Sequence, residues 1–290
     1  MHPSPSTSRT AWRLLIAPLL AIGLLAVPAA VLASGPEGAE PASPDAMART
    51  RTGGWDISYP QCGGPFPRDP EFGIVGVNGG RVFSPNPCLG TGNGPSELEW
   101  AGMNAELYMN TGNPGPELSS YWPHGQTEPR VCNTEAAPGA DTVDCAYDYG
   151  WNAAAHAYRT AVEAYISLGW SEPDATHTPV ANVWWLDVET TNSWRIYREL
   201  NVAMLHGAVD YLESMDVGGV GFYSTQRQWD QITGGTTEFA DYPSWVAGAR
   251  TLAQAKRACA PEVGFTGGPI VLAQYFAGGF DADYRCADSA

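Results

Sequence analysis

The sequence of 290 residues is poor in basic side chains. Lys and Arg number 15, Asp and Glu number 31, and the formal net charge is −16. Nucleic acids and anionic membrane surfaces bind proteins through basic faces. The shortage of cations therefore excludes both as expected partners. Because an acidic balance also keeps proteins soluble, the charge by itself identifies no partner.

Several motifs of common functional sites are missing as well. The sequence has no Cys-x-x-Cys pair and no closely spaced pair among its five histidines, which argues against a zinc site. It has no internal repeat, no glycine-rich phosphate loop and no G-x-S-x-G motif of a serine hydrolase. His156 and His206 fall in predicted helices, where ordinary surface or core positions are the simpler interpretation. We therefore expect neither a metal ion nor a cofactor.

One long apolar run is present, and it lies near the N-terminus from Leu14 to about Leu32. It follows two arginines and ends in small residues, with Val31 and Ala33 at the −3 and −1 positions of a cleavage site. This layout predicts a secretory signal peptide over residues 1–33, and hence a secreted protein without a stable membrane partner. An uncleaved membrane anchor is the alternative, because the run is nearly long enough to span a bilayer.

The cysteines are consistent with export. Residues 34–53 are small, polar and rich in proline, and predict a disordered linker. Residues 54–290 fit a single large domain, and all six cysteines lie within it. In an oxidising compartment an even number of cysteines suggests three disulfides, although sequence alone does not choose the pairing. Pairing of nearest neighbours predicts Cys62–Cys88, Cys132–Cys145 and Cys259–Cys286.

Strand-like and helix-like segments alternate through residues 54–290. Strand patterns occur at 54–60, 72–80, 105–112, 182–190, 217–225, 243–249, 269–276 and 280–286. Helix patterns occur at 95–105, 148–170, 194–216, 226–233 and 251–260, and a long polar loop covers 111–147. Such alternation is typical of parallel strands joined by helical crossovers. We therefore predict an α/β fold, a (β/α) TIM-like barrel with disulfide-bearing loops, in which functional side chains lie at the carboxyl ends of the strands.

The stretch VWWLDVET at residues 183–190 carries two acids at the end of an apolar run. Residues i and i+2 of a strand face the same side, so Asp187 and Glu189 point into one space. Two neighbouring carboxylates separate each other's pKa values, so that one keeps a proton and the other stays ionised. Glycoside hydrolysis needs this division, because one acid protonates the leaving oxygen while the other stabilises positive charge on the sugar. A solvent-facing pair, an arginine partner or a bound calcium ion are the alternatives.

The sequence also contains 11 tryptophans, and flat rings are suitable platforms for sugars. Trp184 and Trp185 are consecutive residues of a predicted strand, so they point to opposite faces. At most one of them faces the barrel interior, and packing against helices is the simpler interpretation for the other.

Five motifs occur in the order found in family-25 glycoside hydrolases. They are GWDIS, WWLDVET, GFYST, SWVAGA and AQYFAGGFDADY, and they span residues 54–284. On these motifs the chain resembles that family, the lysozymes or N-acetylmuramidases that cut peptidoglycan. It also resembles related glycoside-hydrolase-like barrel domains of secreted actinobacterial proteins. The resemblance implies an incomplete or distorted (β/α) barrel.

The resemblance also implies roles for single residues. Glu189 takes the place of the proton donor, and Asp187 takes that of the acid that steadies the reacting sugar or its acetamido group. The third strand lacks the family's Tyr-His-aromatic pattern and offers Tyr108 and Asn110 instead. The residues implied to line the pocket or contact substrate are Asp56, Asp281, Tyr223, Trp245, Gln274 and Tyr275, with Tyr108 as the candidate from the third strand.

These observations lead to two functional hypotheses. The first is a secreted, monomeric glycoside hydrolase that cleaves cell-wall peptidoglycan. The second is a non-catalytic, cell-wall-associated barrel that binds glycan and retains an acidic cleft. The predicted cleft holds four acids, Asp56, Asp187, Glu189 and Asp281, whose negative charges repel one another. A cleft that only binds glycan has no use for this repulsion, so the four acids favour the enzyme. The divergent third strand and the additional disulfide-bearing segments favour the binding protein.

Overall fold

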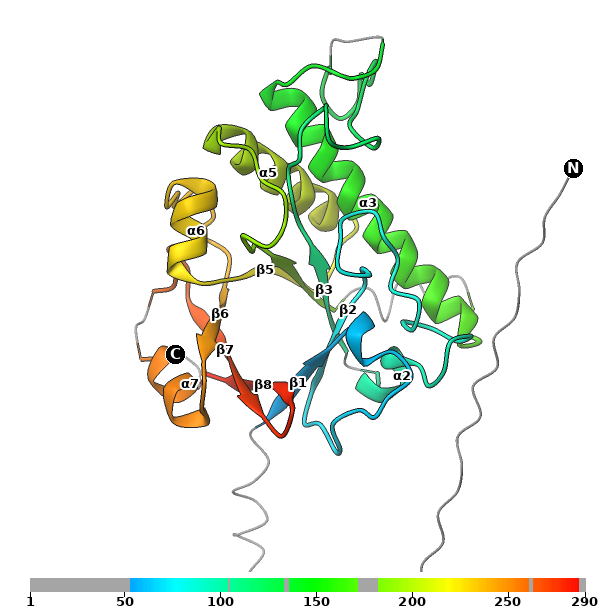
Figure 1. Ribbon diagram of the computed structural model, residues 1–290, viewed down its shortest axis with the longest axis vertical. Helices are drawn as coiled ribbons and strands as arrows, with labels where there is room; N and C mark the ends of the chain where they lie inside the picture. Colours follow the sequence, from blue (N-terminus) through cyan, green and yellow to red (C-terminus); the bar gives the residue numbers. More distant parts are fainter. Residues whose placement is uncertain (1–52, 104, 133–135, 172–181, 261–262, 287–290) are drawn as a thin grey trace, which may run out of the picture. The chain divides into compact units, whose positions relative to one another are not determined.

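Eight strands in the described part of the chain close into one barrel, in sequence order (Figure 1). The computed structural model describes residues 53–103, 105–132, 136–171, 182–260 and 263–286. The predicted signal peptide and all but the last residue of the predicted linker lie outside these ranges. The strands are β1 (Gly54–Ile57), β2 (Gly73–Gly76), β3 (Glu106–Asn110), β4 (Val183–Asp187), β5 (Gly219–Ser224), β6 (Ser244–Ala249), β7 (Ile270–Ala277) and β8 (Phe280–Arg285).

The first seven strands pair in parallel, as predicted, whereas β8 is antiparallel to both β7 and β1. A parallel crossover needs a dozen or more residues, and only Gly278 and Gly279 separate β7 from β8. Both glycines have positive φ, of 59° and 90°, which allows the tight turn. The hairpin places Asp281 opposite Asp56 in the barrel wall.

The helices lie outside the ring of strands (Figure 1). They are α2 (Glu97–Ala101), α3 (Val143–Ser167), α5 (Arg198–Ser214), α6 (Gln226–Thr233) and α7 (Leu252–Ala258), with a short 3-10 helix, η1 (Tyr59–Gln61). Between β1 and β2 the chain forms only η1, so the predicted TIM-like barrel is closed in its strands and irregular in its helices. No helix among the described residues is long and apolar enough to cross a membrane.

The longest helix, α3, packs along α5 on the outside of the barrel (Figure 1). A Cβ at Gly150 would collide with the carbonyl oxygen of Met204, and one at Gly207 with that of Tyr147. The two glycines therefore permit the close approach of the helices. Helix α3 begins five residues before its predicted start because Thr142 caps it, with its side chain accepting from the Cys145 N–H.

The two tryptophans of β4 point to opposite faces, as predicted. Trp184 packs in the outer core, with its ring 6.2 Å from that of Tyr158 on α3. Trp185 lies inside the barrel, 5.7 Å from the ring of Trp245. Both are fully buried, at 0% and 1% exposure, so neither offers a free face to a sugar.

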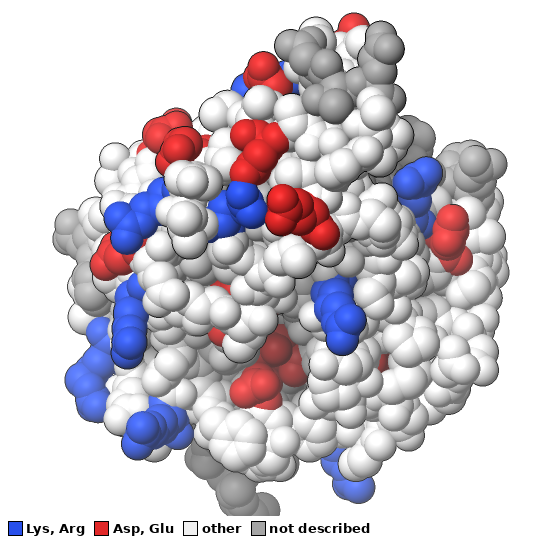
Figure 2. Space-filling model, turned by 45° about the horizontal axis from the view of Figure 1, so that its top comes forward, with Lys and Arg blue, Asp and Glu red and all other residues white. Residues whose placement is uncertain are grey.

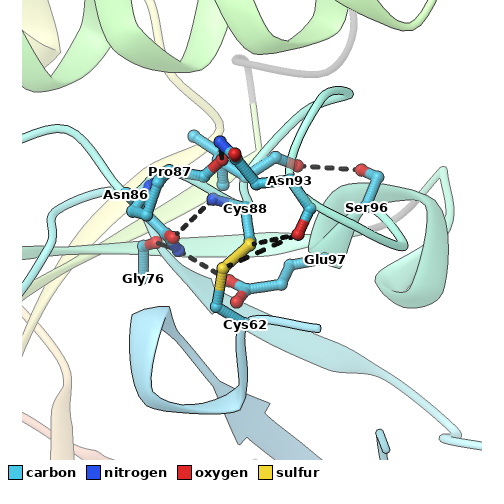
Figure 3. The surroundings of a disulfide bond; sticks show 9 residues. Cys62, Gly76, Asn86, Pro87, Cys88, Asn93, Ser96 and Glu97 are labelled. Carbon is cyan, nitrogen blue, oxygen red and sulfur yellow. Dashed lines mark hydrogen bonds between the residues drawn. A yellow bond between two sulfur atoms is a disulfide. The ribbon is translucent and has the colours of Figure 1, made fainter. Parts of the chain in front are cut away.

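All three predicted disulfides are confirmed: Cys62–Cys88, Cys132–Cys145 and Cys259–Cys286. Cys62–Cys88 joins the end of η1 to the loop before α2 (Figure 3). Below it, the Asn86 side-chain amide donates to the Gly76 carbonyl at 2.7 Å and to Oε2 of Glu97 at 2.6 Å (Figure 3). Glu97 is fully buried, and burial raises its pKa to about 7 against the hydrogen bond from Asn86.

Candidate active site

The carboxyl ends of the strands enclose a group of acids in the barrel mouth. They are Asp56 of β1, Asp187 and Glu189 at the end of β4, and Asp281 and Asp283 of β8. Figure 2 shows acidic side chains gathered in a hollow of the surface. In the described ranges, no group of three or more His, Cys, Asp or Glu side chains is arranged to hold a metal ion.

Asp187 is more buried than Glu189, with only 6% of its surface exposed. Its Oδ2 accepts a hydrogen bond of 2.6 Å from the Asn110 side-chain amide. Its Oδ1 is buried and has no partner among the described residues. Burial and, to a lesser extent, the nearby charge of Glu189 together raise the pKa of Asp187 to about 8, against the opposing effect of the Asn110 hydrogen bond.

Glu189 follows the end of β4 and is half-buried. Its Oε1 accepts from the side-chain amide of Gln228 on α6, at 3.3 Å. Gln228 also accepts from the Thr190 N–H at 2.7 Å, and the Trp194 indole donates to the Glu189 carbonyl at 2.7 Å. These hydrogen bonds fix the backbone that follows β4 and therefore hold the carboxyl of Glu189 in a defined position.

Asp56 and Asp283 form a second pair on adjacent strands. Their carboxyls lie within reach of each other, and each affects the pKa of the other. The Gln274 amide donates to Asp56 at 2.9 Å, and the Trp245 indole donates to Asp283 at 2.8 Å. Burial raises the pKa of Asp56 well above its ordinary value, and the charges of Asp283 and Asp281 add to this. Burial also raises the pKa of Asp283, to about 7. Two charges side by side are therefore disfavoured in this pair.

Several predicted pocket residues belong to the network around this pair. The Tyr223 hydroxyl donates to Oε1 of Gln274 at 2.8 Å, so Gln274 links Tyr223 to Asp56. The Trp245 ring lies 4.5 Å from that of Tyr223 and 6.3 Å from that of Tyr108. Because Trp245 is only 2% exposed, it supports Asp283 rather than presenting a surface to substrate.

The last two predicted site residues, Asp281 and Tyr275, lie at the edge of the acidic cluster or outside it. Asp281 is exposed, at the start of β8 beside the end of β7. Tyr275 follows Gln274 on β7, and successive strand residues point to opposite faces. Because Gln274 contacts Asp56 inside the barrel, the Tyr275 side chain starts on the opposite face of β7, although burial and then the charge of Asp283 still raise its pKa.

Sequence reasoning missed two residues of the site. Asp283 lies two positions after Asp281 in FDADY, the same spacing as the D-x-E pair, and this spacing was a usable signal. Asn110 appeared only as a departure from a family pattern. Its bond to Asp187 joins two neighbouring strands, so it depends on the register of β3 against β4.

Fold and site define a closed α/β barrel with a carboxyl-lined mouth. A family model described as lysozyme-like protein 1 matches residues 174–256, which include Asp187 and Glu189. A segment of 63 residues is 35% identical to probable GH family 25 lysozyme 4 of Dictyostelium discoideum. This match covers 22% of the chain and 29% of that relative. These two matches support the resemblance to family-25 glycoside hydrolases.

Solved structures are similar at low sequence identity. A muramidase from Trichobolus zukalii is 16% identical, with a TM-score of 0.46, over 82% of this chain and 95% of its own. A bacterial lysozyme from Streptomyces coelicolor is 16% identical, with a TM-score of 0.45, over 82% of this chain and 93% of its own.

Proposed function

We propose that the chain is a glycoside hydrolase that cleaves the glycan of bacterial peptidoglycan, with Glu189 as the general acid and Asp187 in support. The observation that carries the proposal is the buried carboxyl of Asp187 beside the half-buried carboxyl of Glu189 at the barrel mouth. The similar proteins are named lysozymes and muramidases, which supports peptidoglycan as the substrate.

The two acids of β4 suit different tasks. With its pKa raised to about 8, Asp187 holds a proton beside Glu189 at neutral pH. Glu189 is the more accessible member, so it protonates the glycosidic oxygen of a bound strand. The free Oδ1 of Asp187 accepts the N–H of an acetamido group, while Asn110 holds the other oxygen. As the sugar gains positive charge, the carboxylates of the cleft stabilise it.

The second pair preserves negative charge where the sugar ring lies. The raised pKa values of Asp56 and Asp283 disfavour two adjacent charges, so the pair keeps at most one charge in this buried position. Gln274 and Tyr223 complete the hydrogen bonds of this pair toward the cleft. Asp281 is exposed and contacts the more distant part of the substrate.

A glycan-binding barrel without turnover is the second candidate. The raised pKa values of Asp56, Asp187 and Asp283 favour it, because protonation relieves the repulsion that a purely binding cleft would otherwise suffer. Release of new reducing ends from purified peptidoglycan by the full chain distinguishes the two. The enzyme releases them, whereas the binding protein sediments with the wall and releases none.

We also propose that the protein is exported and acts outside the cell or at its wall. Three disulfides in the barrel domain support an oxidising compartment. N-terminal sequencing of protein recovered from culture medium tests this proposal and should begin near Ser34. Retention of the whole chain inside the cell with six reactive thiols would refute it.

A further inference from the structure

A second pocket, of about 490 Å³, lies beside the acidic cleft. Its walls come from the segments that follow β2, β3 and β4, and from residues 118–121 of the long loop. Asn192, one of its lining residues, donates its backbone N–H to the carbonyl of Glu189 at 3.2 Å. The pocket is therefore built on the same strand end as the proposed general acid.

The charge of this pocket is opposite to that of its neighbour. None of its lining residues is Asp or Glu, although the chain has 31 acids against 15 basic residues. It contains Arg81, which is exposed and forms no ion pair with any acid in the described ranges. Arg195, by contrast, is held by Asp141. Arg81 is thus a cation without an acidic partner in the described ranges.

Asn192, which lines the pocket, also has an unused donor. Its Nδ2 atom is buried and has no hydrogen-bond partner among the described residues. An unpartnered buried amide is costly, so a rotation of the side chain that turns it toward an acceptor in the pocket is favourable. Arg81 and Asn192 are complementary to a carboxylate, the group that accepts charge-assisted hydrogen bonds most strongly.

An aromatic platform completes the pocket. Tyr121 is 55% exposed, and its ring stacks on that of Phe83 with 4.3 Å between centroids and 7° between planes. Phe83 has a φ of 61°, a left-handed conformation that bulky residues rarely adopt. Such outliers concentrate at functional sites.

The platform is also held rigidly. Trp122, the next residue after Tyr121, is buried and donates its indole N–H to the Ala140 carbonyl at 3.0 Å. The disulfide Cys132–Cys145 ties the same long loop to the start of α3. Because the platform is ordered in advance, binding loses little conformational entropy.

We propose that this pocket, the Arg81 pocket, binds the carboxylate-bearing peptide stem of peptidoglycan while the glycan lies across the acidic cleft. This inference rests on the proposed function, because it assumes a peptidoglycan strand in the cleft. Arg81 and Asn192 receive a stem carboxylate, and the outer face of Tyr121 packs against the neighbouring apolar atoms of the stem or sugar. The acids of the cleft repel the same carboxylate, which fixes the direction in which the strand lies.

The test is calorimetric binding of two soluble probes to the full chain. One is N-acetylmuramyl-L-alanyl-D-glutamate with free carboxylates, and the other is its uncharged diamide. We expect the parent to bind the acid about tenfold more tightly, since charged hydrogen bonds of this kind usually exceed that ratio. Arg81→Gln should lose the preference, whereas Arg159→Gln, on the exposed side of α3, should retain it. Tyr121→Ala should weaken both probes equally, and Tyr121→Phe should restore them.

Equal affinity of the parent for the two probes, or a full preference in Arg81→Gln, would overturn the proposal. A second measurement is the ratio of hydrolysis rates on intact peptidoglycan and on glycan stripped of its stems, which Arg81→Gln should lower about tenfold. If the parent prefers the acid probe yet hydrolyses neither substrate, the proposed function fails and the pocket assignment stands. If the parent hydrolyses both substrates and prefers neither probe, the proposed function stands and the pocket assignment fails.

Discussion

Asn110 donates a 2.6 Å hydrogen bond from its side-chain amide to Oδ2 of Asp187, across the junction of β3 and β4. The bond orients a carboxyl that is only 6% exposed and leaves its Oδ1 without a partner in the described ranges. One oxygen is thus fixed by the protein, while the other is available to a ligand. Asp187 is therefore better suited to hold a substrate than to support the barrel.

The activity should depend on pH through the protonation of Asp187. Because the pKa of Asp187 is raised to about 8, Asp187 holds a proton beside Glu189 below that pH and loses it above. We expect kcat/KM on peptidoglycan to fall about tenfold per pH unit above about pH 8. A rate profile from pH 5 to 10 measures this, and a flat profile from pH 7 to 10 would contradict it.

The free energy of unfolding should also depend on pH through the protonation of Asp187. The folded chain binds this proton more tightly than the unfolded chain, so the stabilisation is complete below the ordinary Asp value of 3.8 and is lost as the pH rises through about 8. Asp187→Asn should flatten this dependence and raise the free energy of unfolding above pH 8, by about 1–3 kcal/mol. Thermal melts from pH 4 to 9 test it, with Glu163→Gln on the exposed side of α3 as the control. A uniform loss of stability in Asp187→Asn would mean that the ionised carboxyl is a structural partner.

Glu97 offers an independent test of the same physics away from the cleft. Its carboxyl is fully buried beside Asn86 with a pKa of about 7, so its stabilisation is present below the ordinary Glu value of 4.5 and is lost as the pH rises through about 7. Glu97→Gln should raise the melting temperature at pH 8 and change it little at pH 4. Glu99→Gln, in the same helical turn but exposed, should change neither. Equal shifts in the two variants would refute a buried, protonated Glu97.

Asp283 controls the protonation of Asp56. Its charge is the largest cause, after burial, of the raised pKa of Asp56. Asp283→Asn should therefore lower the pKa of Asp56 while retaining the partner of the Trp245 indole. Carbon-detected NMR of the aspartate carboxyls measures the titration, and Asp281→Asn, the smaller charge effect, should lower the pKa of Asp56 less. An unchanged Asp56 titration in Asp283→Asn would show that the charge of Asp283 does not control the protonation of Asp56.

Local patterns predicted most of the barrel. The segment QRQWDQIT forms α6 with the predicted bounds, because Thr225 caps its start and Gly234 is left-handed at its end. The alternating strands gave the faces of Asp187, Trp184 and Trp185 correctly. Nearest-neighbour pairing gave all three disulfides.

Features that depend on contacts between segments distant in the sequence were harder to predict. The antiparallel direction of β8 follows from the two-glycine turn after β7, which the alternation of strands and helices obscured. The bond of Asn110 to Asp187 and the effect of Asp283 on the pKa of Asp56 each involve residues from different strands. Sequence spacing gives the face of a residue on its own strand, but the register between strands decides which residues meet.

The most direct test of the central claim compares Glu189→Gln with the parent on purified peptidoglycan. Gln keeps the shape of the side chain and can still contact Gln228, but it cannot give a proton to the leaving oxygen. We expect release of reducing ends to fall by at least about 100-fold, the usual contribution of a general acid, while sedimentation with the wall is retained. Hydrolysis by Glu189→Gln at the parent's rate would contradict the account.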